Sequence, residues 1–272
     1  MILVTGANGN LASAALAALH ARGAAATGGS RTPGAGMRRL DFDDPAGIDF
    51  TGVSTLLLVS AGYAEDDQVV RRHAAALDAA VRDGVRHVVY TSLTAAGDHL
   101  GFALAHRATE RLLRARGLPW TILRNGLYAE LFGGLLMWAG DGVESPFGDG
   151  ALAAVVRADL AEAAAAVAAE AERHAGRTYE LTGTPVTAAS VADRLGVLHR
   201  TIGLAEYRRR LAGMPDLLPF QPPMLASIAT GVRHGFLEGT GADLAGILGR
   251  PARDPLAAAA AAAAATRPVA AR

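Results

Sequence analysis

Residues 1–23 read MILVTGANGNLASAALAALHARG and hold the strongest fold signal in the chain. Ile2 to Val4 form a short apolar run typical of a buried strand, and from Leu11 onward the apolar residues recur at helical spacing. Gly6 and Gly9 therefore fall on a turn from strand to helix. Such a turn can bind a nucleotide diphosphate through backbone N–H groups and the positive end of the helix dipole.

Beyond this turn, apolar strand-like runs alternate with helical patterns. The expected strands are 24–27, 39–42, 55–60, 87–92, 120–124 and 178–181, and the expected helices are 66–82, 102–116 and 157–172. This alternation is typical of a parallel sheet with helices on both faces. Because crossover connections are right-handed, it predicts an α/β fold with a doubly wound, Rossmann-type parallel sheet.

The domain organisation follows from where this pattern becomes irregular. Residues 1–130 are the predicted dinucleotide-binding core, and residues 151–185 return to it. Residues 131–150 and 186–255 are the predicted smaller, mostly helical C-terminal substrate lobe, over the carboxyl edge of the sheet where such folds bind ligands. Residues 256–272 are expected to be an alanine-rich helix that frays into a tail. Within 187–249, helix breaks are expected at Pro215, Pro219, Pro222 and Pro223.

Composition excludes several chemistries. The formal net charge of the 272 residues is +0, which argues against a general nucleic-acid or membrane-surface partner. Cysteine is absent, so disulfides, zinc–thiolate sites and Cys nucleophiles are excluded. Lysine is also absent, which excludes Schiff-base and Walker-type lysines. The eight histidines show no metal-binding spacing, so no metal is expected. With no leader segment or membrane-spanning run, a cytoplasmic location is expected.

The most informative stretches beyond the glycine turn follow the pattern of a known family. They are LVTGANGNLA, SRTP, LDFDDP, LLLVSA, HAAALDAAVRDGVRHVVYTS, HRATERLLRARGLPWTILRNGLYAE, RADLAEAAAAV and GRTYELTG. On these stretches, and over nearly its whole length, the chain resembles the NmrA-like, atypical short-chain dehydrogenase/reductase proteins. The resemblance is greatest to their NAD(P)H quinone oxidoreductase branch. It implies an extended Rossmann unit with a small C-terminal substrate lobe.

The residues after the second strand indicate which dinucleotide would bind. A carboxylate there usually selects NAD by bonding the ribose 2′-hydroxyl, whereas this chain has Ser30-Arg31-Thr32-Pro33. Arg31 can pair with a 2′-phosphate through charge-assisted hydrogen bonds, so NADP(H) is favoured and NAD(H) stays open. The plain alternative is that Arg31 is a solvated surface residue.

Further cofactor contacts are implied by the resemblance. Asp41 and Phe42 would pack on adenine, the segment Ser60-Ala61-Gly62 would follow the ribose and diphosphate, and Thr91 and Ser92 would end near the nicotinamide. The alternative for Thr91 and Ser92 is capping and turn hydrogen bonding. The full predicted cofactor set is Gly6, Asn8, Gly9, Asn10, Leu11, Arg31, Asp41, Phe42, Ser60, Ala61, Gly62, Thr91, Ser92, Arg107 and Asn125.

The catalytic prediction turns on a departure from the family. A Tyr-x-x-x-Lys pair is impossible without lysine, and the position that is usually Lys in this branch is Arg107. Arg107 can hydrogen-bond the nicotinamide ribose, but a guanidinium is an implausible proton donor. His106, Tyr63 and Tyr128 are the candidate donors, each with packing as the alternative reading. Because a reduced quinone takes its proton readily from solvent, this departure affects quinone reduction less than carbonyl reduction.

The predicted function is therefore an NAD(P)H-dependent oxidoreductase that reduces a quinone or polycyclic aromatic substrate. Two alternatives stay open: a tailoring oxygenase or monooxygenase of aromatic polyketide biosynthesis, and a non-enzymatic, redox-sensing NmrA-like regulator. A small aromatic partner is expected, and a homodimer is open. Apolar lobe residues either form a wall for a flat acceptor or pack the lobe's own core: Leu131, Phe132, Leu135, Met137, Trp138, Phe147, Phe220, Met224 and Phe236.

Overall fold

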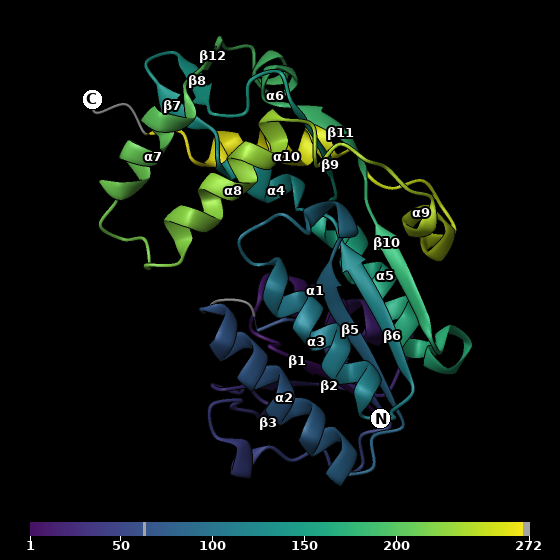
Figure 1. Cartoon of the computed structure of the whole chain (residues 1–272). Helices are drawn as coiled ribbons and strands as arrows, with labels where there is room; N and C mark the ends of the chain where they lie inside the picture. The colour runs from purple at the N-terminus through teal and green to yellow at the C-terminus, as the bar shows by residue number, and fades with distance from the viewer. Residues whose placement is uncertain (62–63, 269–272) are drawn as a thin grey trace.

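A seven-stranded sheet runs through the base of the molecule, with helices on both of its faces (Figure 1). The computed structural model describes residues 1–61 and 64–268. In spatial order the strands are β10 (Arg177–Leu181), β6 (Trp120–Asn125), β5 (His87–Leu93), β4 (Thr55–Leu58), β1 (Ile2–Thr5), β2 (Ala26–Ser30) and β3 (Arg38–Arg39). All neighbouring pairs are parallel, which confirms the predicted doubly wound sheet.

The helices cover the two faces in pairs. Helices α1 (Asn10–Ala21) and α5 (Arg157–Ala169) pack together on one face, and α2 (Asp66–Arg82) and α3 (Ala103–Ala115) pack on the other. The apolar spacing of α1 explains its place, because Leu11, Leu16 and Leu19 are all buried against the sheet. Three short 3-10 turns complete this part: η1 (Pro45–Gly47), η2 (Ala95–Gly97) and η3 (Ala171–His174).

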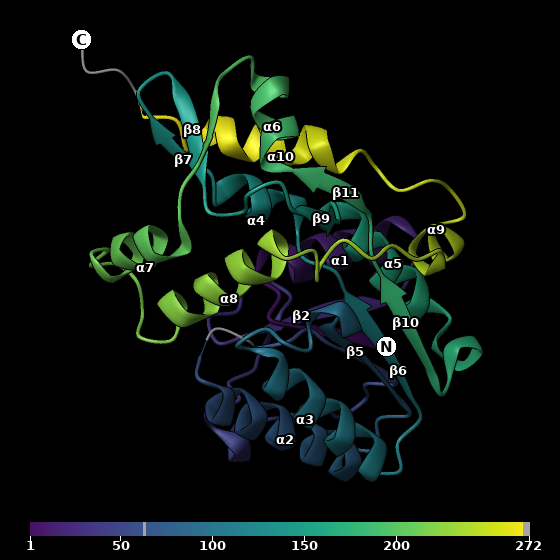
Figure 2. The same ribbon diagram turned by 45° about the horizontal axis from the view of Figure 1, so that its top comes forward.

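A second layer of structure lies at the carboxyl edge of the sheet, because β6 leads into α4 and β10 leads into β11. Its helices are α4 (Ala129–Gly134), α6 (Ala188–Leu195), α7 (Leu204–Ala212), α8 (Gln221–Arg233) and α10 (Pro255–Ala265). Its strands form two small sheets, β12 (His199–Thr201) with β8 (Gly142–Ser145) and β7 (Met137–Ala139), and β11 (Thr184–Thr187) with β9 (Ala151–Ala154). Figure 2 shows this lobe above the main sheet.

The second strand differs from its prediction. The sequence suggested a strand at 24–27, whereas β2 covers Ala26–Ser30 and includes both Gly28 and Gly29. A Cβ at Gly28 would lie 2.5 Å from the Cβ of Ala7, so the strand needs glycine where the first turn crosses it. The third strand is also shorter than the expected 39–42 and covers only Arg38–Arg39.

The lobe contains more strand than its helical pattern suggested. Strand β12 interrupts the expected helical segment 187–249, and β9 pairs with β11 in the lobe rather than joining the main sheet. Pro222 and Pro223 were expected to break a helix, but they lie in the first turn of α8, where a missing N–H breaks no helical hydrogen bond. Helix α9 (Asp243–Leu248) packs back on α5 and β10.

The alanine-rich C-terminal helix is a packed element of the lobe, and it ends at Ala265. In α10, Ala259, Ala260 and Ala263 are buried, and the helix lies against α4 and α6. The indole Nε1 of Trp138 donates a 2.8 Å hydrogen bond to the carbonyl oxygen of Ala263. Nowhere in residues 1–61 or 64–268 is a helix long and apolar enough to cross a membrane.

Candidate functional site

A cavity of about 400 Å³ opens at the carboxyl edge of β1, β2 and β4, and is called here the edge cavity. Most of the residues predicted to bind cofactor lie in its wall: Gly6, Asn8, Gly9, Arg31, Asp41, Phe42, Ser60 and Ala61. Ser30, Leu40, Asp43, Val59 and Arg72 also line it and were not singled out from the sequence. The predicted residues Gly62 and Tyr63 lie outside the described part of the chain.

The glycine turn forms one end of the edge cavity. Gly6 has φ of 64°, a left-handed conformation that favours glycine, and its carbonyl oxygen accepts a 2.8 Å hydrogen bond from the N–H of Gly9. Helix α1 then starts at Asn10 with no side-chain cap and no acidic residue in its first turn. The N–H groups of Asn10 and Leu11 are therefore at an uncapped positive helix end suited to an anion, while the Leu11 side chain is in the core.

Asn8 joins the glycine turn to the loop that carries Arg31. Its Nδ2 donates to the carbonyl oxygen of Thr32 at 2.9 Å and to the Thr32 hydroxyl at 3.1 Å. The Arg31 side chain is exposed and makes no hydrogen bond or ion pair within the described residues. Arg31 thus lies in the cavity wall with its guanidinium available to an anionic ligand.

Asp43 and Arg72, which both line the edge cavity, form an ion pair that was not predicted from the sequence. The guanidinium of Arg72 donates to both oxygens of Asp43, with distances of 2.9 and 2.6 Å. The hydrogen bond from Arg72 holds the pKa of Asp43 below its usual value. The LDFDDP stretch and the arginines of α2 were visible in the sequence, but the pairing itself depends on the packing of α2 beside η1.

His73 holds the segment after β4 in place. The backbone N–H of Ala61 donates to Nε2 of His73 at 2.9 Å, so the proton of a neutral imidazole is on Nδ1, which faces the Thr109 hydroxyl at 2.7 Å. Burial lowers the pKa of His73 to about 3, so this neutral form persists at physiological pH. Similarly, Ser60 N–H donates to the Thr91 hydroxyl at 3.0 Å. Both contacts position a wall of the edge cavity.

The residues predicted for the nicotinamide end lie outside the edge cavity, on α3 and at the carboxyl ends of β5 and β6. The Thr91 hydroxyl accepts from the backbone of Ser60, and the Ser92 hydroxyl donates to Glu110 at 2.7 Å. Both side chains are buried. Their hydroxyls therefore make contacts within the protein, and their place near the nicotinamide stays a prediction.

Arg107 is held in the same network. Its guanidinium donates to Asp98 at 2.6 Å, to the carbonyl oxygens of Leu93 at 2.9 Å and Thr94 at 3.0 Å, and to Glu110 at 2.8 Å. Glu110 is buried, yet its pKa is lowered, because hydrogen bonds from Arg124 and Ser92 outweigh the cost of burial. Arg107 thus links α3 to the loop 93–98 that follows β5.

The candidate proton donors lie in dissimilar surroundings. Nδ1 of His106 is 3.0 Å from the Tyr90 hydroxyl, and burial lowers the pKa of His106 to about 4. The Tyr128 ring packs under the guanidinium of Arg157, whose centre lies 4.9 Å from the ring centroid, and burial raises the pKa of Tyr128. Neither side chain lines a cavity described here.

Asn125 has a buried polar atom without a partner. Its Oδ1 accepts no hydrogen bond from any described residue, although the residue is only 7% exposed. A buried acceptor in this state loses solvation without compensation unless a ligand donates to it. Its place at the carboxyl end of β6 is consistent with a ligand that carries an N–H donor.

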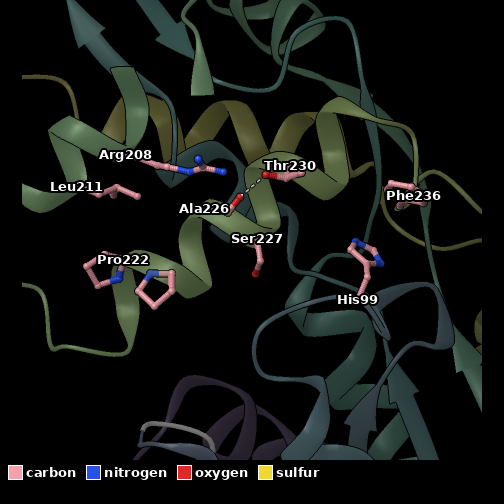
Figure 3. Close-up of a pocket in the computed structure, with 9 residues that line it drawn as sticks. His99, Arg208, Leu211, Pro222, Ala226, Ser227, Thr230 and Phe236 are labelled. Atoms are coloured by element: carbon pink, nitrogen blue, oxygen red, sulfur yellow. Dashed lines mark hydrogen bonds between the residues drawn. The ribbon is translucent and has the colours of Figure 1, made fainter. Parts of the chain in front are cut away.

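A larger cavity of about 680 Å³, the lobe cavity, lies beside α7 and α8 and is drawn in Figure 3. A smaller cavity of about 100 Å³ shares Pro223 with it and reaches Ala64, Glu65 and Asp66 at the start of α2. Of the apolar residues predicted for a substrate wall, Phe220 and Met224 line the small cavity and Phe236 lines the lobe cavity. The others pack the lobe core, where the Phe132 and Phe147 rings stack 4.9 Å apart.

Comparison with known proteins places this architecture among reductases. No protein-family model matches the chain. Quinone oxidoreductase 2 of Escherichia coli (strain K12) is 32% identical over 279 residues, which cover 92% of this chain and 94% of the relative. The solved NADPH-dependent quinone oxidoreductase of Escherichia coli, complexed with NADPH, has a TM-score of 0.84 at 29% identity, covering 96% of this chain and 99% of its own. The triphenylmethane reductase of Citrobacter sp., complexed with NADP(H), has a TM-score of 0.84 at 27% identity over the same shares.

Proposed function

The chain belongs to the NmrA-like family of atypical short-chain dehydrogenases/reductases, in its quinone oxidoreductase branch, and on this premise we propose that it is an NADPH-dependent reductase of quinones. The observation that carries the proposal is the edge cavity, where an uncapped helix end, a glycine turn and an unpaired arginine meet. The proposed substrates include polycyclic aromatic acceptors that are related to quinones.

The residues of the edge cavity suit NADPH group by group. The start of α1, with the Gly6–Gly9 turn beside it, would hold the diphosphate, since the first N–H groups of α1 have no side-chain cap. Arg31 would bind the 2′-phosphate, and Phe42 would pack on the adenine. Outside the edge cavity, at the carboxyl end of β6, the orphaned Oδ1 of Asn125 would accept from the carboxamide of the nicotinamide.

When bound, NADPH supplies a hydride to the acceptor. The protein's part is to hold the nicotinamide and the acceptor in position for this transfer. Arg107 fixes the loop 93–98, which leads directly to His99 in the wall of the lobe cavity. The reduced quinone oxygen gains its proton from solvent, which the open lobe cavity admits, so the buried His106 need not donate one.

The test is NADPH oxidation, followed by absorbance, with neutral 1,4-naphthoquinone as acceptor. We expect turnover by the wild-type protein and loss of both turnover and NADPH binding in Gly9→Val. A Cβ at Gly9 would already lie 3.2 Å from the carbonyl oxygen of Gly6, so a valine side chain would crowd the glycine turn that is proposed to hold the diphosphate. Gly203→Val is the matched control, because a Cβ there meets nothing within 4 Å.

Three outcomes separate the readings. Turnover that disappears only in Gly9→Val supports the proposal. NADPH binding without reduction of any quinone would favour a redox-sensing regulator over an enzyme. Oxygen uptake with an anthrone-like substrate, in place of quinone reduction, would favour the tailoring oxygenase.

A further inference from the structure

We propose that the lobe cavity selects flat aromatic acceptors that carry a negative charge, and that Arg208 binds the anionic group. This inference rests on the proposed function, because it names the class of acceptor that the same enzyme would reduce. The structure supplies three independent supports: the apolar lining of the cavity, the surroundings of Arg208, and the placement of His99.

The body of the cavity is apolar and shaped by rigid residues. Leu211 from α7 and Pro222, Pro223 and Ala226 from α8 line it, with Phe236 at the far end (Figure 3). Prolines and an aromatic ring offer a stiff surface that a planar ring system can cover without ordering flexible side chains. This lining favours an aromatic body over a sugar or a peptide.

Most polar groups in the wall are already used within the protein. The Ser227 hydroxyl donates to the carbonyl oxygen of Met224 at 2.7 Å and accepts from the N–H of Gly101 at 3.1 Å. The Thr230 hydroxyl donates to the carbonyl oxygen of Ala226 at 2.8 Å. Recognition of a polar substituent is therefore left to the two basic residues of the wall, Arg208 and His99.

Arg208 differs from its neighbour Arg210 on the same helix. Arg210 pairs with Glu144 and Glu206, whereas Arg208 makes no hydrogen bond or ion pair with any residue that the structure describes. Figure 3 shows its side chain extending from α7 toward α8. No carboxylate is among the described residues that line the cavity. A guanidinium so placed binds a carboxylate or sulfonate through two parallel N–H bonds.

His99 supplies a second polar contact on the side of the loop that follows β5. Its ring centroid lies 5.0 Å from that of Phe236, and its Nε2 would be 2.5 Å from a Cβ at position 231. The ring therefore depends on Gly231 to lie against α8. Arg208 and His99 come from opposite walls of the cavity, so one planar acceptor can contact both (Figure 3).

The experiment compares 1,4-naphthoquinone-2-sulfonate with neutral 1,4-naphthoquinone in wild-type protein, Arg208→Gln and Arg209→Gln. Arg209 is exposed on the same helix but does not line the cavity, so it is the matched control. We expect Arg208→Gln to raise the KM for the sulfonate about tenfold or more, the scale of a charged hydrogen bond. The KM for the neutral quinone should stay within about twofold, and Arg209→Gln should change neither.

A binding measurement separates this inference from the proposed function. Isothermal titration of 9,10-anthraquinone-2-sulfonate into the NADP⁺-loaded protein needs no turnover. Weaker binding in Arg208→Gln, together with a loss of affinity at high salt in the wild type, supports the anionic site even if no quinone is reduced. Turnover of both quinones with equal affinities in wild type and Arg208→Gln would overturn the inference and leave the reductase function intact.

Discussion

Arg107 and Glu110 lie one turn apart on α3, and their side chains meet in an ion pair of 2.8 Å. Glu110 is 1% exposed and also binds Arg124 at 2.8 Å, so a buried carboxylate joins α3 to β6. The other N–H groups of Arg107 reach the backbone of the loop 93–98. The arginine that departs from its family thus has a structural explanation, because its planar fork spans several acceptors at once.

The first prediction follows from this geometry. In Arg107→Lys, all the N–H donors of the side chain are on one ammonium nitrogen. That nitrogen cannot hydrogen-bond Leu93, Thr94, Asp98 and Glu110 together, as the Arg107 guanidinium does. We expect a loss of about 1–3 kcal/mol in the free energy of unfolding and a raised KM for the acceptor, measured by urea denaturation and steady-state kinetics. Arg111→Lys, on an exposed position of α3, is the control. Unchanged stability and kinetics in Arg107→Lys would show that a point charge suffices here.

The second prediction concerns the choice of cofactor. The Arg31 side chain is exposed and makes no hydrogen bond or ion pair within the described residues, so its removal leaves no buried group without a partner. Arg31→Ala should weaken NADPH binding about tenfold to a hundredfold, the scale of one or two charged hydrogen bonds, and leave NADH binding unchanged. Fluorescence titration with both cofactors measures this, with Arg22→Ala at the other end of α1 as control. An equal loss for NADPH and NADH would remove Arg31 from the 2′-phosphate.

The cofactor end was predictable because its signals are local. Gly6, Gly9 and Arg31 sit at fixed offsets from strands whose apolar runs are plain in the sequence, and the structure brings them into one cavity. The parallel sheet follows from the alternation of strands and helices for the same reason. Within that sheet the boundaries shifted, as at β2, which extends through Gly28, where Ala7 approaches closely.

The other contacts of the candidate site were less predictable because they depend on pairings between segments that are distant in the sequence. Asp43 meets Arg72, Glu110 meets Arg124, and His99 meets Phe236 only after the sheet and lobe have packed. The sequence around each apolar residue of the lobe does not indicate whether that residue lines a cavity or packs in the core. The alanine run 257–265 similarly has no amphipathic pattern, and its burial depends on glycine in α4.

The third prediction uses the buried imidazole of His73. Its folded pKa of about 3 lies below the ordinary value of 6.5, so between these values the unfolded chain binds a proton that the folded chain does not. The contribution of His73 to stability is therefore complete above about pH 6.5 and is lost as the pH falls toward 3.

Urea denaturation between pH 4 and pH 8 tests this dependence. In His73→Phe, the free energy of unfolding should decrease less steeply as the pH falls than it does in the wild type. The variant should also bind NADPH more weakly, because the Ala61 N–H loses its acceptor. His234→Gln, at an exposed position after α8, should leave the profile as it is. A wild-type stability that is constant from pH 6.5 to pH 4 would contradict the assignment of a neutral, buried His73.

The last prediction concerns the contact that holds the C-terminal helix. A Cβ at Gly133 in α4 would overlap the carbonyl oxygen of Ala259 in α10, whereas a Cβ at Gly134 meets nothing within 4 Å. Gly133→Ala should therefore push α10 away from α4 and destabilise the protein by about 1–3 kcal/mol. Gly134→Ala should be neutral or stabilising by up to about 1 kcal/mol, since alanine favours the helix. Denaturant titration of both variants measures the difference. Equal stabilities of the two variants would mean that α10 does not pack closely against α4 at Gly133. The burial of the alanines of α10 would then need another explanation.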